Sequence, residues 1–279
     1  MYRYTRWSAF REVGLWLAAL PILFPLYLIL TVALKPATEP TGSGLEPPAH
    51  PTLHNFSGAW GQAGAGTVSF AGALMNSLLT TGGAALLLVL TAAPAGYVIA
   101  RRGSKLSGLV FGLFSLGMIL PFQLAIIPLY DVMVRAGLYG TRIGLILIYT
   151  AITMPLAVFL YTGFLRGMPQ AYEEAALVDG AKPLRVFVEI VFPQAAPVTG
   201  VVTVLCGLLV WNDFFIALVF VGNTNRETLP VAVYSFVGRF STQWPLVFAA
   251  ASIALAPVIV LYGFMQRWIT RGFASTLHG

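Results

Sequence analysis

Apolar residues along this chain come in runs that are long enough to cross a lipid bilayer. Crossing about 30 Å of hydrocarbon takes roughly 20 helical residues at about 1.5 Å of rise each. Six runs reach this length: Val13 to Leu34, Leu74 to Ala100, Leu106 to Tyr130, Ile143 to Leu165, Val198 to Val221 and Leu246 to Gln266. The fifth run carries Asp213, and the other five contain no charged residue. The pattern predicts an all-α, polytopic membrane protein with six transmembrane helices.

Proline residues and the first apolar run refine this prediction. Proline occurs inside five of the six runs, and because it removes a backbone donor and crowds the preceding turn, we expect kinked helices. The first run follows a basic segment, as a secretory signal does. It is too long for a signal and lacks a small-residue cleavage pattern, so we expect a retained span.

The basic residues lie mainly on one side of the predicted spans. With a cytoplasmic N-terminus, 11 of the 16 Lys and Arg residues fall in inside segments and 5 fall outside. This bias predicts that both termini are cytoplasmic. Only 9% of residues are charged, against about 25% in soluble domains, which excludes a water-soluble surface. The net charge of +6 therefore reflects topology and does not indicate a nucleic-acid partner.

The first outside segment and the single cysteine offer little chemistry. Residues 35–70 are rich in Pro, Gly and polar residues without an apolar period, so we expect an exposed loop that could contact an extracytoplasmic partner. His50 and His54 have a helical spacing, but the surrounding prolines and glycines argue against a helix, and we expect no metal site. Cys206 lies within an apolar run, where a small packing residue is expected.

The inside segment 166–197 has the pattern of a helix, a turn and a second helix. Pro169 suits a first helical turn, and Glu173 and Glu174 place negative charge near that positive end. Asp179 and Gly180 supply a stop, because glycine accepts the left-handed conformation that closes a helix. A second short helix is predicted to begin near Pro183 and to end before Pro193.

Two interpretations of this segment remain open from the residues alone. An amphipathic hairpin that caps the bundle would explain the apolar residues Leu177, Val178, Val186 and Ile190. It would not explain why acidic residues and the small residues Ala175 and Ala176 are grouped on the first helix. Small side chains there would let another backbone approach closely.

The same segment resembles the EAA loop of ABC importer permeases. The match is carried by Glu174, Ala175, Ala176, Gly180, Ile190 and Pro193, with Phe192 where that family usually has Leu. Trp211, Asn212, Asp213 and Phe214 resemble a signature of the carbohydrate-uptake branch, the relatives of the six-span maltose permease subunit. Asn76-Ser77 and the segment from Pro121 to Leu129 are also similar to that branch, whereas the last residues depart from its usual ending.

The resemblance implies a complete transport assembly around this chain. It would comprise a second permease subunit, two ATPase subunits that hold ATP and Mg, and an extracytoplasmic solute-binding protein. The chain itself would be no enzyme and would bind no cofactor or metal; no Gly-x-x-x-x-Gly-Lys-Ser/Thr loop occurs in it. It would lie in the lipid bilayer of a bacterial or archaeal cytoplasmic (inner) membrane and carry a carbohydrate.

The resemblance also implies an organisation along the chain and a set of site residues. Residues 1–12 would be a cytoplasmic N-terminal segment, 13–34 the first transmembrane helix, 35–70 the extracytoplasmic loop, 71–269 the permease core with its coupling loop at 166–197, and 270–279 a cytoplasmic tail. The ATPase-coupling residues would be Glu173, Glu174, Ala175, Ala176, Asp179 and Gly180. The substrate-pathway candidates are Asn76, Gln123, Trp211, Asn212 and Asp213.

Asp213 has two interpretations, because a charge inside a span must face the bundle interior or a wet cavity. It forms either a polar wall of the sugar path or a hydrogen-bond hub that joins helices. Three other functions stay as alternatives for the whole chain: a permease for another polar solute (a peptide, an amino acid or a polyol phosphate), a secondary transporter, and a lipid-acting enzyme. The last would need clustered catalytic groups, but the chain has only three histidines.

Overall fold

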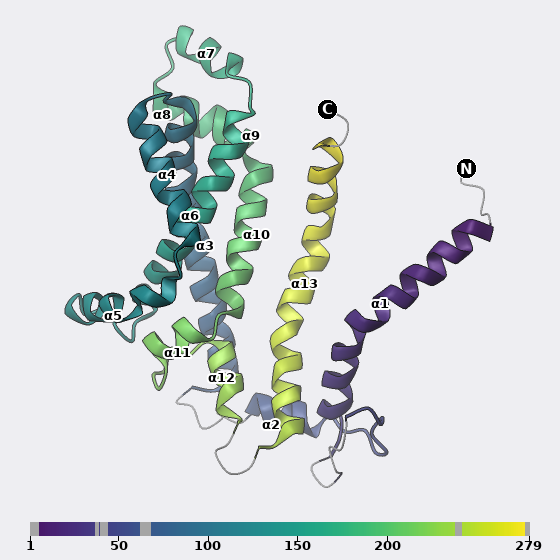
Figure 1. The fold of residues 1–279 in the computed structure, drawn as a ribbon. Helices are drawn as coiled ribbons and strands as arrows, with labels where there is room; N and C mark the ends of the chain where they lie inside the picture. The colour runs from purple at the N-terminus through teal and green to yellow at the C-terminus, as the bar shows by residue number, and fades with distance from the viewer. Residues whose placement is uncertain (1–5, 37–38, 40–43, 62–67, 238–241, 277–279) are drawn as a thin grey trace. The chain divides into compact units, whose positions relative to one another are not determined.

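In the computed structural model, residues 6–36, 39, 44–61, 68–237 and 242–276 are described, and these residues form helices and no strand. The first residues of the predicted N-terminal segment and the last three of the predicted tail lie outside them. The helices, in chain order (Figure 1), are α1 (Arg6–Ala33), α2 (His54–Gly61), α3 (Phe70–Arg101), α4 (Lys105–Ile119), η1 (Phe122–Ala125), α5 (Ile126–Arg135), α6 (Arg142–Arg166), α7 (Ala171–Val178), α8 (Pro183–Val186), η2 (Phe187–Val191), α9 (Phe192–Gln194), α10 (Ala196–Asn212), α11 (Phe215–Val221), α12 (Leu229–Ser235) and α13 (Trp244–Thr276). The all-α prediction is confirmed for this part of the chain.

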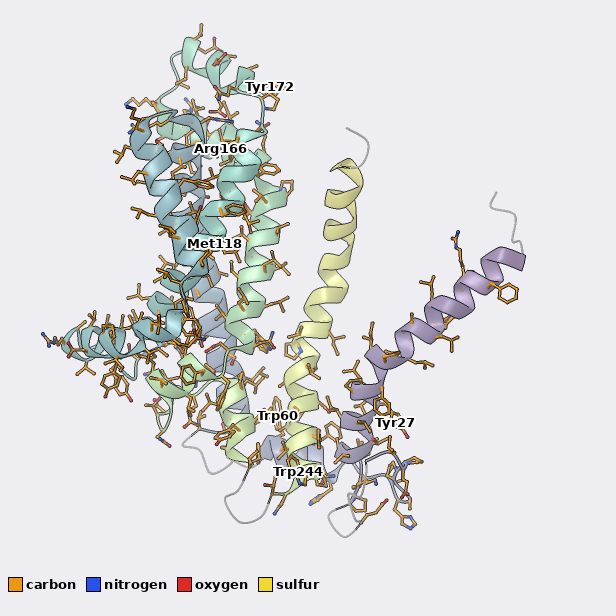
Figure 2. All side chains as sticks on the ribbon, viewed as in Figure 1. Tyr27, Trp60, Met118, Arg166, Tyr172 and Trp244 are labelled. Carbon is orange, nitrogen blue, oxygen red and sulfur yellow. The ribbon has the colours of Figure 1, made fainter. Side chains whose placement is uncertain are left out.

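The chain divides into two compact units, and the first comprises residues 1–71 and 232–257. In this unit the end of α1 is closed by side chains from the segment that follows it. Asn55 Nδ2 donates to the backbone oxygens of Ala33 and Lys35, at 2.8 and 2.7 Å. The hydroxyl of Tyr27, which is labelled in Figure 2, donates to the backbone oxygen of Leu45 at 2.9 Å.

The helix α2 corrects the prediction that residues 35–70 form a loop without a helix. The helix begins at His54, and Asn55 on its first turn is buried. The physical reason is that the last carbonyl groups of α1 have no partners within that helix and need donors from elsewhere. A short helix presents the Asn55 amide to them, and apolar periodicity does not reveal such a polar contact.

The second unit comprises residues 72–231 and 258–279, and its core lies among α3, α4, α6 and α10. Both α4 and α10 pack along α6. Helices α3 and α6 approach closely at Gly96, where an added Cβ would lie 2.6 Å from Tyr161 Cβ. The buried side chains include Leu88, Ala92, Tyr161, Leu165, Val186, Val202 and Cys206.

Apolar helices of spanning length account for part of the six-span prediction. Three helices among the described residues are long and apolar enough to cross a bilayer: Phe10–Ala33, Phe70–Arg101 and Arg142–Arg166. Two further candidates are bent pairs, Lys105–Ile119 with Phe122–Arg135 at 97° and Pro183–Gln194 with Ala196–Asn212 at 73°. The apolar part of α13, Trp244–Val260, is shorter. These helices are those of a polytopic membrane protein.

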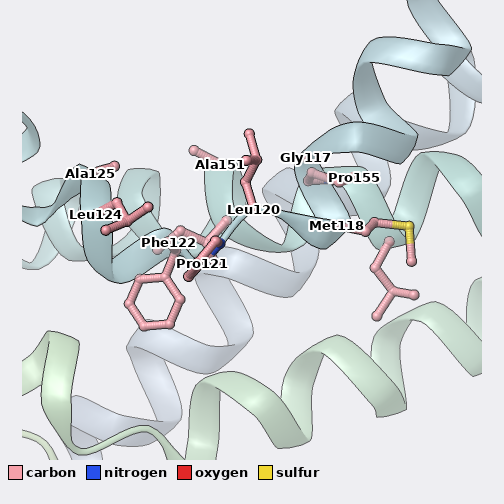
Figure 3. A pocket seen from close by; sticks show the side chains of 11 residues that line it. Gly117, Met118, Leu120, Pro121, Phe122, Leu124, Ala125, Ala151 and Pro155 are labelled. Carbon is pink, nitrogen blue, oxygen red and sulfur yellow. The ribbon is translucent and has the colours of Figure 1, made fainter.

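The third predicted span, Leu106 to Tyr130, is not one straight helix. Helix α4 ends at Ile119, and Leu120 is extended, with φ −70° and ψ 127°. Pro121 explains the break, because its ring disfavours the helical conformation of the residue before it. Figure 3 shows Pro121 and Phe122 at this bend, with Pro155 of α6 also beside the pocket of about 650 Å³.

The fifth predicted span, Val198 to Val221, is also interrupted. Helix α10 ends at Asn212, Asp213 is extended, and α11 starts at Phe215. The interruption leaves the first N–H groups of α11 without partners from a preceding turn. The side chain that takes them is described below.

Candidate coupling surface and transport path

The turn after α7 has the geometry that the sequence predicted for the inside loop, but α7 begins at Ala171, so Pro169 lies before the first helical turn and not in it. Gly180 has φ +84°, the left-handed conformation that closes a helix. Its N–H donates to the Leu177 oxygen at 3.1 Å, and the Ala181 N–H donates to the Ala176 oxygen at 3.0 Å. The predicted helix, turn and helix are confirmed as structure, with the second helix starting at Pro183.

The predicted end of the second helix is wrong. The chain stays helical through a wide turn at Phe187–Val191 and through Pro193 to Gln194. Proline has no N–H to donate to the carbonyl four residues earlier and would clash with it in a regular helix. The π-type turn, which ends at Val191, accommodates the missing donor, so the chain stays helical through Pro193. A bend of 73° follows Gln194.

The outer surface of α7 combines charge, small side chains and exposed apolar groups. Glu174, Ala175, Asp179 and Gly180 are exposed. Val178 is 87% exposed and Tyr172, which Figure 2 labels, is 64% exposed. A pocket of about 310 Å³ borders this surface and is lined by Ala176, Asp179, Gly180, Ala181, Arg185, Val186, Glu189 and Ile190. Apolar groups exposed beside charges are typical of a surface that binds another protein.

Glu173 does not share this surface with Glu174, although the sequence analysis grouped the two. Its residue is 6% exposed, and its Oε1 lies 2.6 Å from Arg101 Nη2. The Tyr97 hydroxyl donates to Glu173 Oε2 at 3.0 Å. The Glu173 carboxylate is therefore engaged within the chain, and the acidic groups of α7 that can meet another protein are Glu174 and Asp179.

Asn76, a candidate for the substrate path, is 5% exposed and fully engaged in the second unit. Its Nδ2 donates to the backbone oxygens of Asn225 and Glu227, both at 3.1 Å. Its Oδ1 accepts from Arg142 Nη2 at 2.7 Å. These contacts tie the first part of α3 to the start of α6 and to the segment before α12.

Asp213 is the hydrogen-bond acceptor at the break between α10 and α11. Its Oδ1 accepts from the backbone N–H groups of Ile216 and Ala217 at 2.9 and 3.3 Å, and from the Tyr149 hydroxyl on α6 at 2.9 Å. These bonds satisfy the free donors at the start of α11 and link it to α6. The contacts favour the interpretation of Asp213 as a hub that joins helices.

Among the described residues, the side chains of the remaining path candidates form no hydrogen bond with the Asp213 carboxylate. Trp211 is 8% exposed in the last turn of α10. Asn212 is exposed, and its Nδ2 donates to the Leu208 oxygen at 2.9 Å. Gln123 in η1 is exposed and is not among the residues that line the pocket at the bend. That pocket is lined by apolar side chains, which offer a sugar no hydrogen bonds.

Comparison with known proteins decides the family. Residues 92–275 match the family described as "Binding-protein-dependent transport system inner membrane component". This chain belongs to that family. Because the match covers the loop with α7 and the break at Asp213, both features lie within the part that this permease shares with the family.

Two relatives of this permease are named for carbohydrates. It is 38% identical over 252 residues to the melibiose/raffinose/stachyose import permease protein MelC of Bacillus subtilis strain 168. The aligned residues cover 90% of this chain and 89% of MelC. It is 30% identical over 243 residues to a protein of Thermoanaerobacterium thermosulfurigenes, over 87% of this chain and 86% of that protein. That protein is named as AmyC, a probable permease for starch degradation products.

A solved structure has the same fold as this permease. It is a bacterial ABC transporter involved in the import of the acidic polysaccharide alginate, with a TM-score of 0.79 and 19% sequence identity. The similarity covers 96% of this permease and 99% of the compared chain. It extends the likeness in fold beyond the residues matched by the family.

Sequence reasoning missed two arginines of the permease that hold its helices together. Arg101 was counted among the basic residues that orient the chain, and Arg142 among the few outside ones. The structure pairs Arg101 with Glu173 and Arg142 with Asn76. No signal in the sequence separated Glu173 from Glu174; in the structure, Glu173 lies three residues before Ala176, on the face of α7 that packs against the core.

Proposed function

We propose that this permease forms, together with a second permease subunit, the membrane path of a carbohydrate importer. The single observation that carries the carbohydrate assignment is the 38% identity to a protein named for melibiose, raffinose and stachyose import. The match spans about nine-tenths of both chains, so it includes the membrane helices and not only the loop. The proposed solute class is therefore an oligosaccharide.

The proposed topology has six spans with both termini in the cytoplasm. In this topology the three long apolar helices, the two bent pairs and α13 would be the six crossings. The excess of basic residues in the segments next to Arg101 and Arg166 supports this orientation. The loop with α7 then lies on the cytoplasmic side, where an ATPase subunit can reach it.

The proposed coupling element is α7. Its outer surface presents Glu174 with the small residue Ala175, and the following turn exposes Asp179. An ATPase groove lined with basic groups fits this combination, because small side chains permit close backbone approach and carboxylates form charge-assisted hydrogen bonds. The ATP and Mg would be held by two ATPase subunits, and the solute would be delivered by an extracytoplasmic binding protein.

The experiment is affinity purification of the tagged chain in mild detergent, with mass spectrometry of the proteins that accompany it. The native chain is expected to recover an ATPase with a Walker motif, a second permease and the solute-binding protein. Gly180→Asp should weaken ATPase recovery, because a side chain at φ +84° strains the turn that orients α7. Glu174→Ala should reduce transport more than assembly, since a surface charge pair contributes about 1 kcal/mol or less.

A matched control is Gly163→Ala, in α6, where an added Cβ meets nothing within 4 Å and the conformation is helical. It should leave ATPase recovery unchanged. Recovery of the chain alone would contradict the importer assembly. The recovered binding protein is then titrated with raffinose, maltotriose, a tripeptide and an amino acid; binding of the tripeptide or amino acid but neither sugar would replace the carbohydrate assignment.

A further inference from the structure

We propose that Arg101 is a positioning residue that joins α7 to the ends of α3 and α6, so that a displacement of α7 moves both membrane helices together. This inference rests on the proposed function, in which an ATPase displaces α7. It goes beyond that function by assigning the link through which the displacement reaches the spans.

The Arg101 guanidinium contacts three elements at once. From the last residue of α3, its Nη2 donates to Glu173 Oε1 on α7 at 2.6 Å, and its Nε donates to the same oxygen at 3.0 Å. Its Nη1 donates to the Leu165 oxygen near the end of α6 at 2.6 Å, and its Nη2 also reaches the Met168 oxygen at 3.3 Å. A single side chain therefore fixes α7 and closes the end of α6.

Burial makes this contact stiff. The side chains of Arg101 and Glu173 are 11% and 7% exposed, so water competes weakly for their hydrogen bonds. The planar guanidinium has five donors in a fixed geometry, and this geometry specifies the angle between its partners. The Tyr97 hydroxyl, one turn earlier on α3, donates to Glu173 Oε2 at 3.0 Å and holds the second carboxylate oxygen.

Two other ion pairs among the described residues join only neighbouring turns of one segment. Arg135 with Asp131, and Arg185 with Glu189, are pairs four residues apart, and all four side chains are more than half exposed. Such pairs connect neighbouring turns of the chain and contribute little. Within the described part of the chain, the Arg101–Glu173 pair is the ion pair that connects separate membrane and loop helices.

A stiff link matters because α7 is short. Eight residues are too few for a helix to hold its position without tertiary contacts. The outward residues of α7 contribute little to its attachment, because Tyr172, Leu177 and Val178 are 64%, 48% and 87% exposed. The buried side of α7 contributes the Glu173 carboxylate and the partly buried Ala176. Without the Arg101 hydrogen bonds, α7 would stay attached through its connecting segments, its packing on α8 and η2 and the one hydrogen bond from Tyr97, and it would lose its ion pair with α3.

The test measures the distance between spin labels at Val178→Cys on α7 and Gly103→Cys after α3, with Cys206→Ala as background. Both label sites are exposed, and a Cβ at Gly103 meets nothing within 4 Å. The chain is placed in lipid nanodiscs, alone and with the ATPase that purifies with it, without nucleotide and with ADP and vanadate. In the native chain we expect one narrow distance that is the same in all states.

The decisive variant is Arg101→Met with Glu173→Leu, which removes both charges and leaves no unpaired buried charge to prevent folding. We expect loss of the narrow peak and a shift with ADP and vanadate, because α7 now moves without α3. The exchanged pair, Arg101→Glu with Glu173→Arg, restores the ion pair but not the donors to Leu165 and Met168. It should recover a narrower peak than the apolar variant.

The control is Arg135→Met with Asp131→Leu, which removes an exposed ion pair on α5 and should keep the native distance. If the folded apolar variant of Arg101 and Glu173 also keeps the narrow, nucleotide-independent distance, the pair serves stability alone and the inference is overturned. Absence of any ATPase with the native chain would overturn the proposed function instead. In that case, the width of the distance distribution in the isolated chain still reports whether the hydrogen bonds of Arg101 hold α7 in place.

Discussion

A carboxylate in an apolar helix has to be explained by its partners, and Asp213 has three. The Tyr149 hydroxyl and the N–H groups of Ile216 and Ala217 all donate to its Oδ1. Two of these N–H groups lack a helical partner only because the helix is broken at Asp213, so the break provides donors for the carboxylate and the carboxylate satisfies them. A substrate contact is not needed to account for the charge.

Replacing Asp213 by Ala should lower the free energy of unfolding by about 2 kcal/mol, because it removes a helix cap and a link to Tyr149. Asp213→Asn keeps an acceptor oxygen and should lose less. The melting temperatures of the purified variants in detergent measure the difference, with Asn212→Ala, whose bond to Leu208 is local, as the comparison. If Asp213→Asn kept native stability but abolished transport, Asp213 would belong to the sugar path.

Asn76 has the same structural character and gives a second prediction. Asn76→Leu keeps the size of the side chain and removes the donors to Asn225 and Glu227 and the acceptor for Arg142. We expect a loss of about 3 kcal/mol, because buried polar groups are left without partners. The exposed neighbouring change Met75→Leu should stay within about 0.5 kcal/mol. Equal melting temperatures for the two variants would contradict this role.

The two adjacent acids of α7 show what sequence can resolve for single residues. Glu173 and Glu174 are identical in type and neighbours in sequence, yet one is buried against Arg101 and the other is exposed. The family resemblance specified the motif position of Glu174. It also grouped Glu173 with the coupling residues, and the structure corrects this, because the partner of Glu173 is 72 residues away and is recognised only once α3 and α7 are placed together.

Elements were predictable where a local cause is sufficient. Gly180 ends α7 and Pro183 begins α8 because each residue's own backbone preference decides the matter. The bend at Pro121 agrees with the kink expected from a proline inside the third run. The break after Asn212 was not located, because the fifth run has no internal proline and its apolar pattern does not show where a helix changes direction. The wide turn before Pro193 was missed for a related reason: a proline can be accommodated by the preceding turn.

The turn at Gly180 provides the prediction at this scale. Gly180→Ala should cost about 1–2 kcal/mol, because φ +84° is unfavourable for a residue with a Cβ. No atom within 4 Å would meet that Cβ, so the cost is conformational. Gly180→Asn should be milder, since Asn tolerates this region better. Heat denaturation of the two variants in detergent tests the order, and the opposite order would contradict it.

For the whole molecule, the charge bias and the apolar runs predict the sidedness of each loop. Single cysteines at Val178 and at Leu53 should behave oppositely toward a membrane-impermeant maleimide. Leu53→Cys should react in intact cells, whereas Val178→Cys should react only after permeabilisation, because the two lie on opposite sides in the proposed topology. The side chains are 70% and 87% exposed, so access to the thiol does not limit either reaction.

The native Cys206 is 1% exposed and serves as the unreactive control. Ala136→Cys, in the exposed connection between α5 and α6, should follow Leu53→Cys. Labelling of Val178→Cys in intact cells would contradict the proposed topology and the access of an ATPase to α7.

The long separation between Arg101 and Glu173 also has a consequence in time. While the ribosome is still making α6, Glu173 has not yet been synthesised and Arg101 is an unpaired cation beside a newly inserted helix. In the proposed topology, its positive charge at that stage would favour retention of the end of α3 in the cytoplasm. Once α7 is made, the same guanidinium is paired with Glu173 and buried. The residue would thus act first in membrane insertion and afterwards in joining the finished helices.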